Sequence, residues 1–219
     1  MSKDKQVRTT SKQNETKNLI LRYALKLFNE KGIEYVGVRE IANDLNLRVG
    51  NVTYYFPVKD EITYAISKQL AELNSKTITV VDGLTMSDFL KRYHQVFENH
   101  YQYRCLFISF VQQFEQNIKV QKAYLKTQQA RYATLKKNIL ELVENKFMKQ
   151  QITENQINFL VSALSLTARF WLSEARVSYK HLSKKKVFKH YLELIAHLLY
   201  PYATKQGERQ IETFLRSLK

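Results

Sequence analysis

Residues 38–56, VREIANDLNLRVGNVTYYF, decide the fold that this sequence predicts. In the first half of the stretch, apolar residues recur three and four places apart on one helix face, which predicts a short helix over about 38–45. In the second half they lie four places apart and predict another short helix over about 48–56. Asn46 tolerates the positive φ of a tight turn between the two, and Pro57 ends the second helix because it pushes the preceding residue out of helical geometry.

A longer amphipathic helix is predicted directly before this stretch, over about 13–31. Its apolar residues come in pairs four places apart, as expected for one buried helix face, and Gly32 after Lys31 suits a left-handed helix cap. Two short helices around a tight turn, laid over a longer helix, are the pattern of a helix-turn-helix. We bound this domain at 13–58, and the polar, basic residues 1–12 predict a flexible arm before it.

Beyond this domain the predicted helices become longer and form a second, larger domain over 59–219. The chain's 5 Gly and 2 Pro residues are too few for a sheet-rich fold with many tight turns. The run from Arg104 to about Glu115 is apolar on nearly every side, so we expect it at the centre of this domain. The predicted fold class is therefore all-α, with an N-terminal three-helix helix-turn-helix domain followed by a larger helical domain. The helices expected in the second domain span about 60–80, 87–100, 104–115, 117–147, 153–175 and 183–202, followed by a short amphipathic tail.

The net charge of +15 favours an anionic partner, most simply nucleic acid. Residues 1–60 hold 11 Lys and Arg against 7 Asp and Glu, and residues 61–219 hold 24 against 13. The positive charge is therefore spread over the whole chain and does not locate a binding surface by itself.

The single cysteine, Cys105, lies in an apolar run, which indicates core packing more than redox sensing. A lone thiol also suits a reducing cytoplasm. No apolar run follows Met1, and none approaches about 18 residues, so we expect neither a signal peptide nor a membrane span. The sequence thus predicts a cytoplasmic protein.

Three linked segments resemble the DNA-binding domain of the TetR family of bacterial transcription regulators. They are residues 24–32, ALKLFNEKG; residues 38–42, VREIA; and residues 50–62, GNVTYYFPVKDEI. Gly37 and Arg48 depart from the family pattern, because they stand where Ser or Thr commonly caps the second and third helices. The resemblance implies an all-helical homodimer that binds a palindromic operator, with a ligand pocket between the helices of the C-terminal domain.

The resemblance also implies that the helix over 48–56 enters the major groove, where its residues at base edges would be Arg48, Val49, Gly50 and Thr53. Arg39 would then reach a guanine edge with two hydrogen bonds, and a thymine methyl group would meet Val49 or the methyl group of Thr53. The other polar side chains near this helix are interpreted as phosphate contacts, which set the register and carry the salt-dependent affinity. For Arg39 and Arg48 the alternative is an ordinary solvated charge at a helix start. The predicted DNA-contacting residues are Arg39, Arg48, Val49, Gly50, Asn51, Thr53, Tyr54, Tyr55 and Lys59.

The middle of the chain is rich in aromatic residues, and the polar His100 and Arg169 stand near aromatic runs. A mostly apolar, aromatic cavity would suit a flat or lipophilic molecule. The alternative, which stays open here, is that the same residues fill a solid core. The predicted ligand-binding residues are Tyr93, Phe97, His100, Tyr103, Phe107, Phe110, Tyr132, Arg169 and Trp171.

The predicted function is a sequence-specific DNA-binding regulator, a repressor that a small, largely apolar or aromatic ligand releases from a palindromic operator. Its partners would be operator DNA, the effector and a second copy of the chain. The homodimer would form through the helices around Leu160–Ala175 and Phe188–Tyr202, which are more apolar than one buried face needs. The first alternative is a DNA-binding regulator without a small-molecule ligand, controlled by a protein partner or by its own abundance.

A remote alternative is a helical metal-dependent enzyme, because His94 and Glu98 lie one helical turn apart. Two ligands are too few for a metal site, and the sequence shows no phosphate-binding glycine loop, no paired cysteines and no nucleophile elbow. We therefore expect no catalysis, no metal site and no cofactor.

Overall fold

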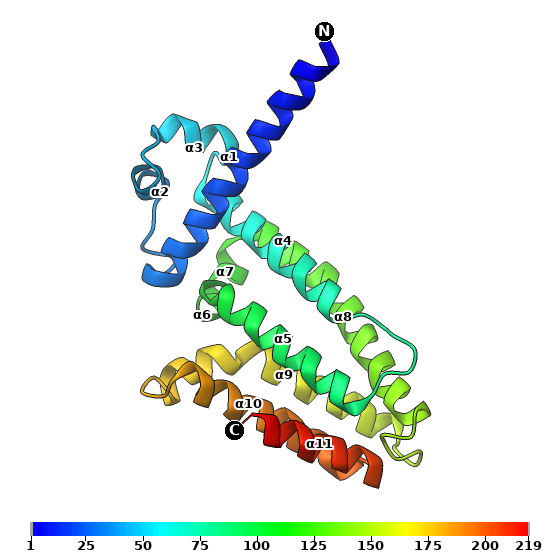
Figure 1. The fold of residues 1–219 in the computed structure, drawn as a ribbon. Coiled ribbons are helices and arrows are strands. Elements are labelled where there is room, and N and C mark those ends of the chain that lie inside the picture. Colours follow the sequence, from blue (N-terminus) through cyan, green and yellow to red (C-terminus); the bar gives the residue numbers. More distant parts are fainter. Residues whose placement is uncertain (1, 219) are drawn as a thin grey trace. The chain divides into compact units, whose positions relative to one another are not determined.

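The computed structural model describes the backbone of residues 2–218 and the side chains of residues 13–218, and Figure 1 shows its helices. The described part contains helices and their connections, with one isolated β-bridge between Met148 and Ala203. This confirms the all-α prediction. The elements are α1 (Ser2–Lys31), α2 (Val38–Asp44), α3 (Val49–Tyr55), α4 (Lys59–Thr77), α5 (Met86–Gln102), α6 (Arg104–Ile108), α7 (Phe110–Gln116), α8 (Ile118–Glu144), α9 (Glu154–Ser178), α10 (Lys184–Leu199), the 3-10 helix η1 (Tyr200–Tyr202) and α11 (Lys205–Ser217).

The chain divides into two compact units, each built from two separate segments. Unit 1 comprises residues 1–70 and 103–122, and unit 2 comprises residues 71–102 and 123–219. Helices α4 and α8 each run from one unit into the other. The division between the two compact units thus falls within α4, and the predicted domain boundary after residue 58 stays a prediction.

Hydrogen bonds explain why residues 103–122 belong to unit 1. The backbone N–H of Cys105 donates to Oδ1 of Asn29 on α1 at 3.0 Å. The side-chain amide of Asn117 donates to the carbonyl of Asp60 on α4 at 3.0 Å. Both bonds join this segment to helices that precede it by more than fifty residues, which local sequence patterns do not show.

The first helix, α1, begins at Ser2 instead of near residue 13. The intervening residues contain neither Gly nor Pro, which are the strongest helix breakers. The side chains of residues 1–12 lie outside the described part of the chain, so the predicted arm stays a prediction. The helix ends as expected: Gly32 has a φ of 98°, and its N–H donates to the carbonyl of Phe28 at 3.0 Å.

The apolar run from Arg104 to Glu115 forms two short helices instead of one central helix. Ser109, with φ −97° and ψ 20°, ends α6 and begins α7. Val111 on α7 is 57% exposed, so the expectation of a central helix was wrong. A run that is apolar on every side of a helix has no helical periodicity of apolar and polar residues. The sequence pattern therefore does not show where the helix breaks, here at Ser109, a residue type that favours helix ends.

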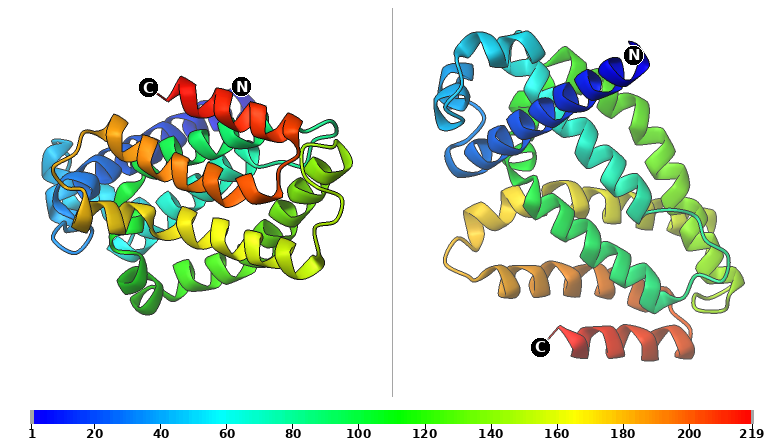
Figure 2. Two further views of the ribbon diagram at one scale, coloured as in Figure 1. Left: turned by 90° about the horizontal axis from the view of Figure 1, so that it is seen from below. Right: turned by 45° about the horizontal axis from the view of Figure 1, so that its top comes forward.

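In unit 2, α10 packs against α5, α9 and α11, and Figure 2 shows these helices side by side. The predicted start of α9 is confirmed by a capping box, in which Thr153 Oγ1 accepts from the Gln156 N–H at 3.3 Å. Ser183 caps α10 in the same way, by accepting from the N–H of Lys186 at 3.4 Å. Side-chain caps thus begin both long helices where the sequence placed them.

The closing helix, α11, packs closely onto the rest of unit 2 at Gly207. A Cβ atom built on Gly207 would lie 2.1 Å from the carbonyl oxygen of Phe147, so the helix can approach this backbone only without a side chain there. Further along, Oε1 of Gln210 accepts from the N–H of Ser87 on α5 at 2.8 Å. The tail that the sequence predicted as a short amphipathic segment is therefore an integral helix of unit 2.

Candidate nucleic-acid interface and effector region

The turn between α2 and α3 is built around Asn46, which has a φ of 54° as the sequence predicted. Its N–H donates to the carbonyl of Asn43 at 3.0 Å, and the N–H of Leu47 donates to the carbonyl of Ala42 at 2.9 Å. Asn is one of the few residues other than Gly that adopt this conformation readily. The closed turn fixes the direction in which α3 leaves α2.

The two faces of α3 differ sharply in burial. Val52 is 0% exposed, and Phe56 just after the helix is 3% exposed. Asn51 is exposed, and Tyr54 is 71% exposed. The ring of Tyr54 meets the ring of Tyr55 edge to face, with centroids 5.0 Å apart. The helix thus anchors itself with one face and presents polar and aromatic groups on the other.

Two arginines flank the same surface from the start of each helix. Arg39 lies in the first turn of α2, and Arg48 is the residue directly before α3; both are exposed. In the described part of the chain, neither guanidinium makes an ion pair or hydrogen bond within the protein. Together with the exposed Val49 and Gly50, they leave this surface positively charged and sterically open.

Thr53 and Lys59 have partners within the protein. The hydroxyl of Thr53 donates to the carbonyl of Val49 at 3.3 Å, a bond that stays within α3. The ammonium group of Lys59 donates to the carbonyl of Ile33 at 2.8 Å and to that of Glu34 at 3.3 Å. Lys59 therefore ties the start of α4 to the loop after α1, a structural role that the sequence did not predict.

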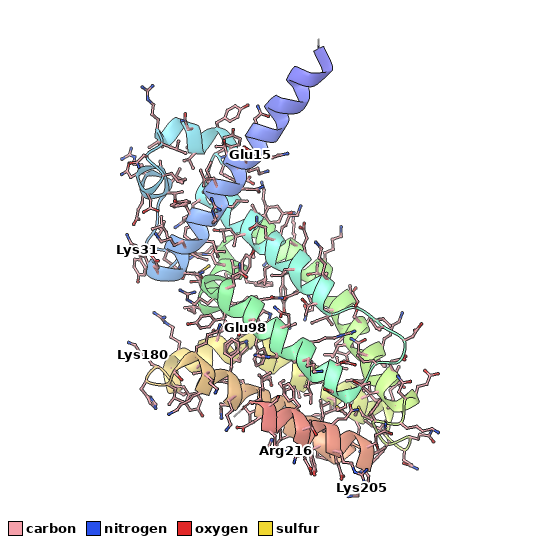
Figure 3. All side chains as sticks on the ribbon, in the orientation of Figure 1. Glu15, Lys31, Glu98, Lys180, Lys205 and Arg216 are labelled. Carbon is pink, nitrogen blue, oxygen red and sulfur yellow. The ribbon has the colours of Figure 1, made fainter. Side chains whose placement is uncertain are left out.

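An ion pair links α1 to α2. Nζ of Lys31, labelled in Figure 3 at the end of α1, lies 2.5 Å from Oε1 of Glu40. The hydrogen bond to this carboxylate, followed by its charge, raises the pKa of Lys31. The pair is exposed and holds α2 beside α1 without occupying the outer face of α3.

In unit 2, part of the predicted effector region is a compact aromatic cluster. Phe97 stacks on Trp171 with centroids 4.5 Å apart and planes inclined by 17°. Phe188 meets the Trp171 ring edge to face at 5.3 Å. Tyr93 and His100 on α5 are buried as well. Trp171 itself is fully buried, so these rings contact one another as a core does.

A chain of side-chain hydrogen bonds runs from the surface to this cluster. The amide of Gln95 donates to Oδ1 of Asn99 at 3.0 Å, and the amide of Asn99 donates to Oδ1 of Asn74 at 2.9 Å. The Nδ2 atom of Asn74 lies 3.1 Å from Nε2 of His100. The side-chain amides of Asn99 and Asn74 each accept a hydrogen bond through the oxygen and donate one through the nitrogen. Because an amide nitrogen only donates, Nε2 of His100 is the acceptor at the end of the chain.

His100 is therefore a neutral imidazole that carries its proton on Nδ1. Burial lowers the pKa of His100 to about 3, the positive charge of Arg131 lowers it further, and a hydrogen bond to the backbone of Ala168 opposes both. Nδ1 also lies 3.4 Å from the indole nitrogen of Trp171. A protonated Nδ1 has no lone pair for the indole N–H, so the indole of Trp171 makes only a close contact and the backbone of Ala168 is the hydrogen-bond partner.

The remaining predicted ligand-binding residues are dispersed. Tyr103, Phe107 and Phe110 belong to unit 1. Tyr132 is exposed, and its hydroxyl donates to Oδ1 of Asn158 at 3.4 Å. Arg169 is half-buried, with its Cζ atom 5.4 Å from the ring centre of Tyr124.

Two family models match this chain. The model of "Bacterial regulatory proteins, tetR family" matches residues 20–66, and the model "TetR", a bacterial transcriptional repressor, matches residues 65–211. The chain belongs to the TetR family. It is thus a TetR-family transcription regulator, and α1 to α3 contain the family's helix-turn-helix, as the resemblance implied.

Individual TetR-family relatives agree with this assignment. YttP of Bacillus subtilis (strain 168), a probable HTH-type transcriptional regulator, is 36% identical over 63 residues, which are 29% of this chain and 30% of YttP. A TetR-family regulator from Marinobacter aquaeolei VT8 has a TM-score of 0.85 at 18% identity, over 93% of this chain and 98% of that one. A transcriptional regulator from Saccharomonospora viridis in complex with choline has a TM-score of 0.65 at 17% identity, over 84% and 97%. At these identities the solved structures show the shared fold.

The two residues considered for metal binding in this TetR-family chain are otherwise engaged. Nε2 of His94 lies 4.0 Å from Oε1 of Glu98, and the other oxygen of Glu98 accepts from Nζ of Lys184 at 2.7 Å. Within residues 2–218, no three His, Cys, Asp or Glu side chains gather where they could hold a metal ion. Nor does any helix in that range have the length and apolarity to cross a membrane.

Proposed function

We propose that this TetR-family chain is a repressor that binds a palindromic operator as a homodimer and is released by a small molecule. The observation that carries the DNA-binding part is the two-faced α3. Its buried face fixes it to unit 1, while Arg39, Arg48, Asn51 and Tyr54 lie exposed around its outer face. Exposed arginines beside a helix of a helix-turn-helix are suited to reading guanine edges and phosphates.

The proposed contacts divide into two kinds. The residues that would face base edges are Arg39, Arg48, Val49, Gly50 and Thr53. The methyl group of Thr53 would make its contact, because its hydroxyl is used within the helix. The phosphate contacts would come from Asn51, Tyr54 and Tyr55. Lys59 has a lesser part, since two of its three ammonium hydrogens already bond to carbonyl groups.

Control by a small molecule is proposed from the connections between the units. Helices α4 and α8 continue from unit 1 into unit 2, so a change of either helix in unit 2 reaches unit 1 along the backbone. A ligand shifts the equilibrium between two arrangements of these helices only if it binds the two arrangements with different affinities. The choline complex of the Saccharomonospora viridis regulator is a precedent for a small molecule on this fold.

The test starts from DNA fragments that the full-length protein selects from a random pool. With the selected operator, Arg39→Ala should cost about 1–3 kcal/mol and relax the preference at one base position, because a bidentate base contact is lost. Tyr54→Phe should weaken binding to all sequences alike. Fluorescence anisotropy at fixed salt concentration measures both.

Arg176→Ala is the matched control, because Arg176 is an exposed arginine on α9 of unit 2. It removes the same charge, and we expect wild-type affinity for DNA. If Arg39→Ala binds as tightly as Arg176→Ala, the assigned surface is wrong. If no DNA is selected at all, the repressor function itself fails.

A further inference from the structure

Two arginines of unit 2 gather around one tyrosine. Tyr124 and Arg131 lie seven residues apart on α8, which is two helical turns and therefore one face. The Cζ atom of Arg131 lies 5.9 Å from the centre of the Tyr124 ring, and that of Arg169 on α9 lies 5.4 Å from the same centre. Arg169 also lies 5.9 Å from the ring of Phe170. One aromatic ring thus holds two positive charges close together.

No carboxylate balances these charges within the described part of the chain. The ion pairs there involve neither Arg131 nor Arg169. Burial is the main cause that lowers the pKa of Arg131; Tyr124 opposes this shift, and the like charge of Arg169 adds a smaller lowering. Cation–π contacts are weaker than a hydrogen-bonded carboxylate, so the two guanidinium groups remain undercompensated.

Both solvent and surrounding protein atoms reach the side chain of Arg131. Its side chain is accessible to solvent, and yet protein surrounds it closely enough for burial to be the main cause of its lowered pKa. Its positive charge also acts on His100, which is neutral and bonded to Asn74. The groups that interact electrostatically with Arg131 are thus Arg169, Tyr124 and the neutral His100, and the side chain of Arg131 is accessible to solvent.

We propose that Arg131 and Arg169 together bind the carboxylate of the effector, an organic acid with an apolar body. The proposal rests on the small-molecule control proposed above and names the chemical class of the ligand. A guanidinium presents planar N–H donors that match the two oxygens of a carboxylate, and both guanidinium groups lie close to the ring of Tyr124. The aromatic surface of Phe170 beside Arg169 accommodates the apolar part of such a molecule.

The first experiment measures the melting temperature of the full-length protein with four probes of matched size. Octanoate and 4-phenylbutyrate are the acids, octanol is the neutral analogue, and octylamine is the cationic one. We expect both acids to raise the melting temperature and the other two to leave it unchanged. Arg131→Gln and Arg169→Gln should each weaken octanoate binding about tenfold or more, because a charged hydrogen bond is lost.

Arg176→Gln is again the matched control, as an exposed arginine seven residues further along α9. Octanoate should stabilise this variant as it does the wild type. If octanol stabilises the protein as well as octanoate, if inorganic phosphate alone reproduces the effect, or if neither acid binds, the proposal is overturned. The same holds if both site variants bind octanoate with wild-type affinity.

A second measurement needs no ligand. If Arg131 and Arg169 await an anion, Arg131→Gln relieves their repulsion, and the melting temperature of the ligand-free protein should rise. If the pair is purely structural, the same variant loses a packed contact and melts at a lower temperature, which contradicts the proposal. DNA binding by each variant is measured in parallel. Operator binding with no acid effect rejects only the acid site, whereas absence of operator binding rejects the repressor function.

Discussion

At the scale of single residues, His100 is the most constrained polar group of unit 2. Its imidazole accepts a hydrogen bond from Asn74 at one nitrogen and faces the backbone of Ala168 with the other. Stacked aromatic rings cover it on the side of Phe97, whose centroid lies 6.5 Å away. A proton added to this ring would displace the Asn74 amide and bring a charge next to Arg131. Protonation of His100 is therefore coupled to unfolding.

The sign of this coupling follows from the direction of the pKa shift. The pKa of His100 falls from 6.5 in the unfolded chain to about 3 in the folded one, so only the unfolded chain takes up the proton in between. The contribution of the neutral His100 to the free energy of unfolding is complete well above pH 6.5 and is lost as the pH falls toward 3. Between pH 7 and pH 5 the loss is about 2 kcal/mol. Urea unfolding at both pH values should show this loss in the wild type. It should disappear in His100→Gln and persist in His197→Gln, a substitution at an exposed histidine; an unchanged pH dependence in His100→Gln would contradict the assignment.

What the sequence predicts about a residue depends on how far away its partners lie. Gly32 and Asn46 lie at turns where the backbone requires a positive φ, and their positive φ values were predicted correctly. Cys105 was correctly placed in the core, where burial raises the pKa of its thiol to about 12. Lys59 donates to carbonyls 25 and 26 residues earlier in the chain, and Asn74 bonds to residues on α5. Neither role could be predicted, because the local sequence pattern does not contain the partners.

At the scale of elements, α11 shows how one missing side chain decides a packing distance. Thr204 caps the helix by accepting from the N–H of Gly207 at 3.2 Å. The same Gly207 faces the carbonyl of Phe147 so closely that no Cβ fits. Because the carbonyl of Phe147 belongs to the backbone and cannot rotate away, a side chain at residue 207 would push α11 away from this segment.

Gly207→Ala should therefore destabilise the protein by about 2 kcal/mol or more, as overpacking and backbone displacement do. Gly50→Ala on α3 is the control, because a Cβ there meets nothing within 4 Å and Ala favours helix over Gly by about 1 kcal/mol. Thermal unfolding followed by circular dichroism compares the two, and hydrogen exchange should show faster exchange in α11 of Gly207→Ala. Equal melting temperatures for the two variants would mean that the close approach of Gly207 to the Phe147 carbonyl does not affect the stability of the protein.

Elements were predictable from the sequence where apolar residues followed a clear helical period. Nearly all of α2, α3, α9 and α10 was located in this way, with ends within a few residues. The aromatic set of the effector region was predicted as one group, yet the structure divides it between two units, because aromatic content alone does not say which helices pack together. The hydrogen-bond chain from Gln95 to His100 and the pairing of Arg131 with Arg169 depend on three-dimensional proximity, and the sequence did not reveal them.

At the scale of the whole molecule, α9 carries apolar side chains on a face that its own chain leaves open. Phe159, Leu166 and Val177 are exposed, at spacings of 7 and 11 residues that keep them on one side of the helix. Leu194 on α10 is exposed as well. We interpret this face as the surface of the proposed homodimer, since a large exposed apolar patch commonly marks an interface.

Two substitutions on α9 distinguish a dimer interface from the core of the chain: Leu166→Glu and Leu164→Glu. Leu166 is 58% exposed and Leu164 is 0% exposed. Leu166→Glu should leave the helical content unchanged and shift sedimentation at micromolar concentration from dimer to monomer, because the charge would be buried only in the dimer. Leu164→Glu places the charge inside the chain and should unfold it. A Leu166→Glu variant that still sediments as a dimer would exclude this face.

The discontinuous build of unit 1 has a consequence for synthesis and for protein engineering. As the chain leaves the ribosome, residues 1–70 emerge first, then a segment of unit 2, and only then the stretch 103–122 whose Cys105 and Asn117 complete the bonds to Asn29 and Asp60. The DNA-binding half is thus finished late, after part of its neighbour already exists. We therefore expect a chimaera that joins residues 1–70 to a foreign sensor to be more stable when it also carries residues 103–122, or a surface that makes the same two hydrogen bonds.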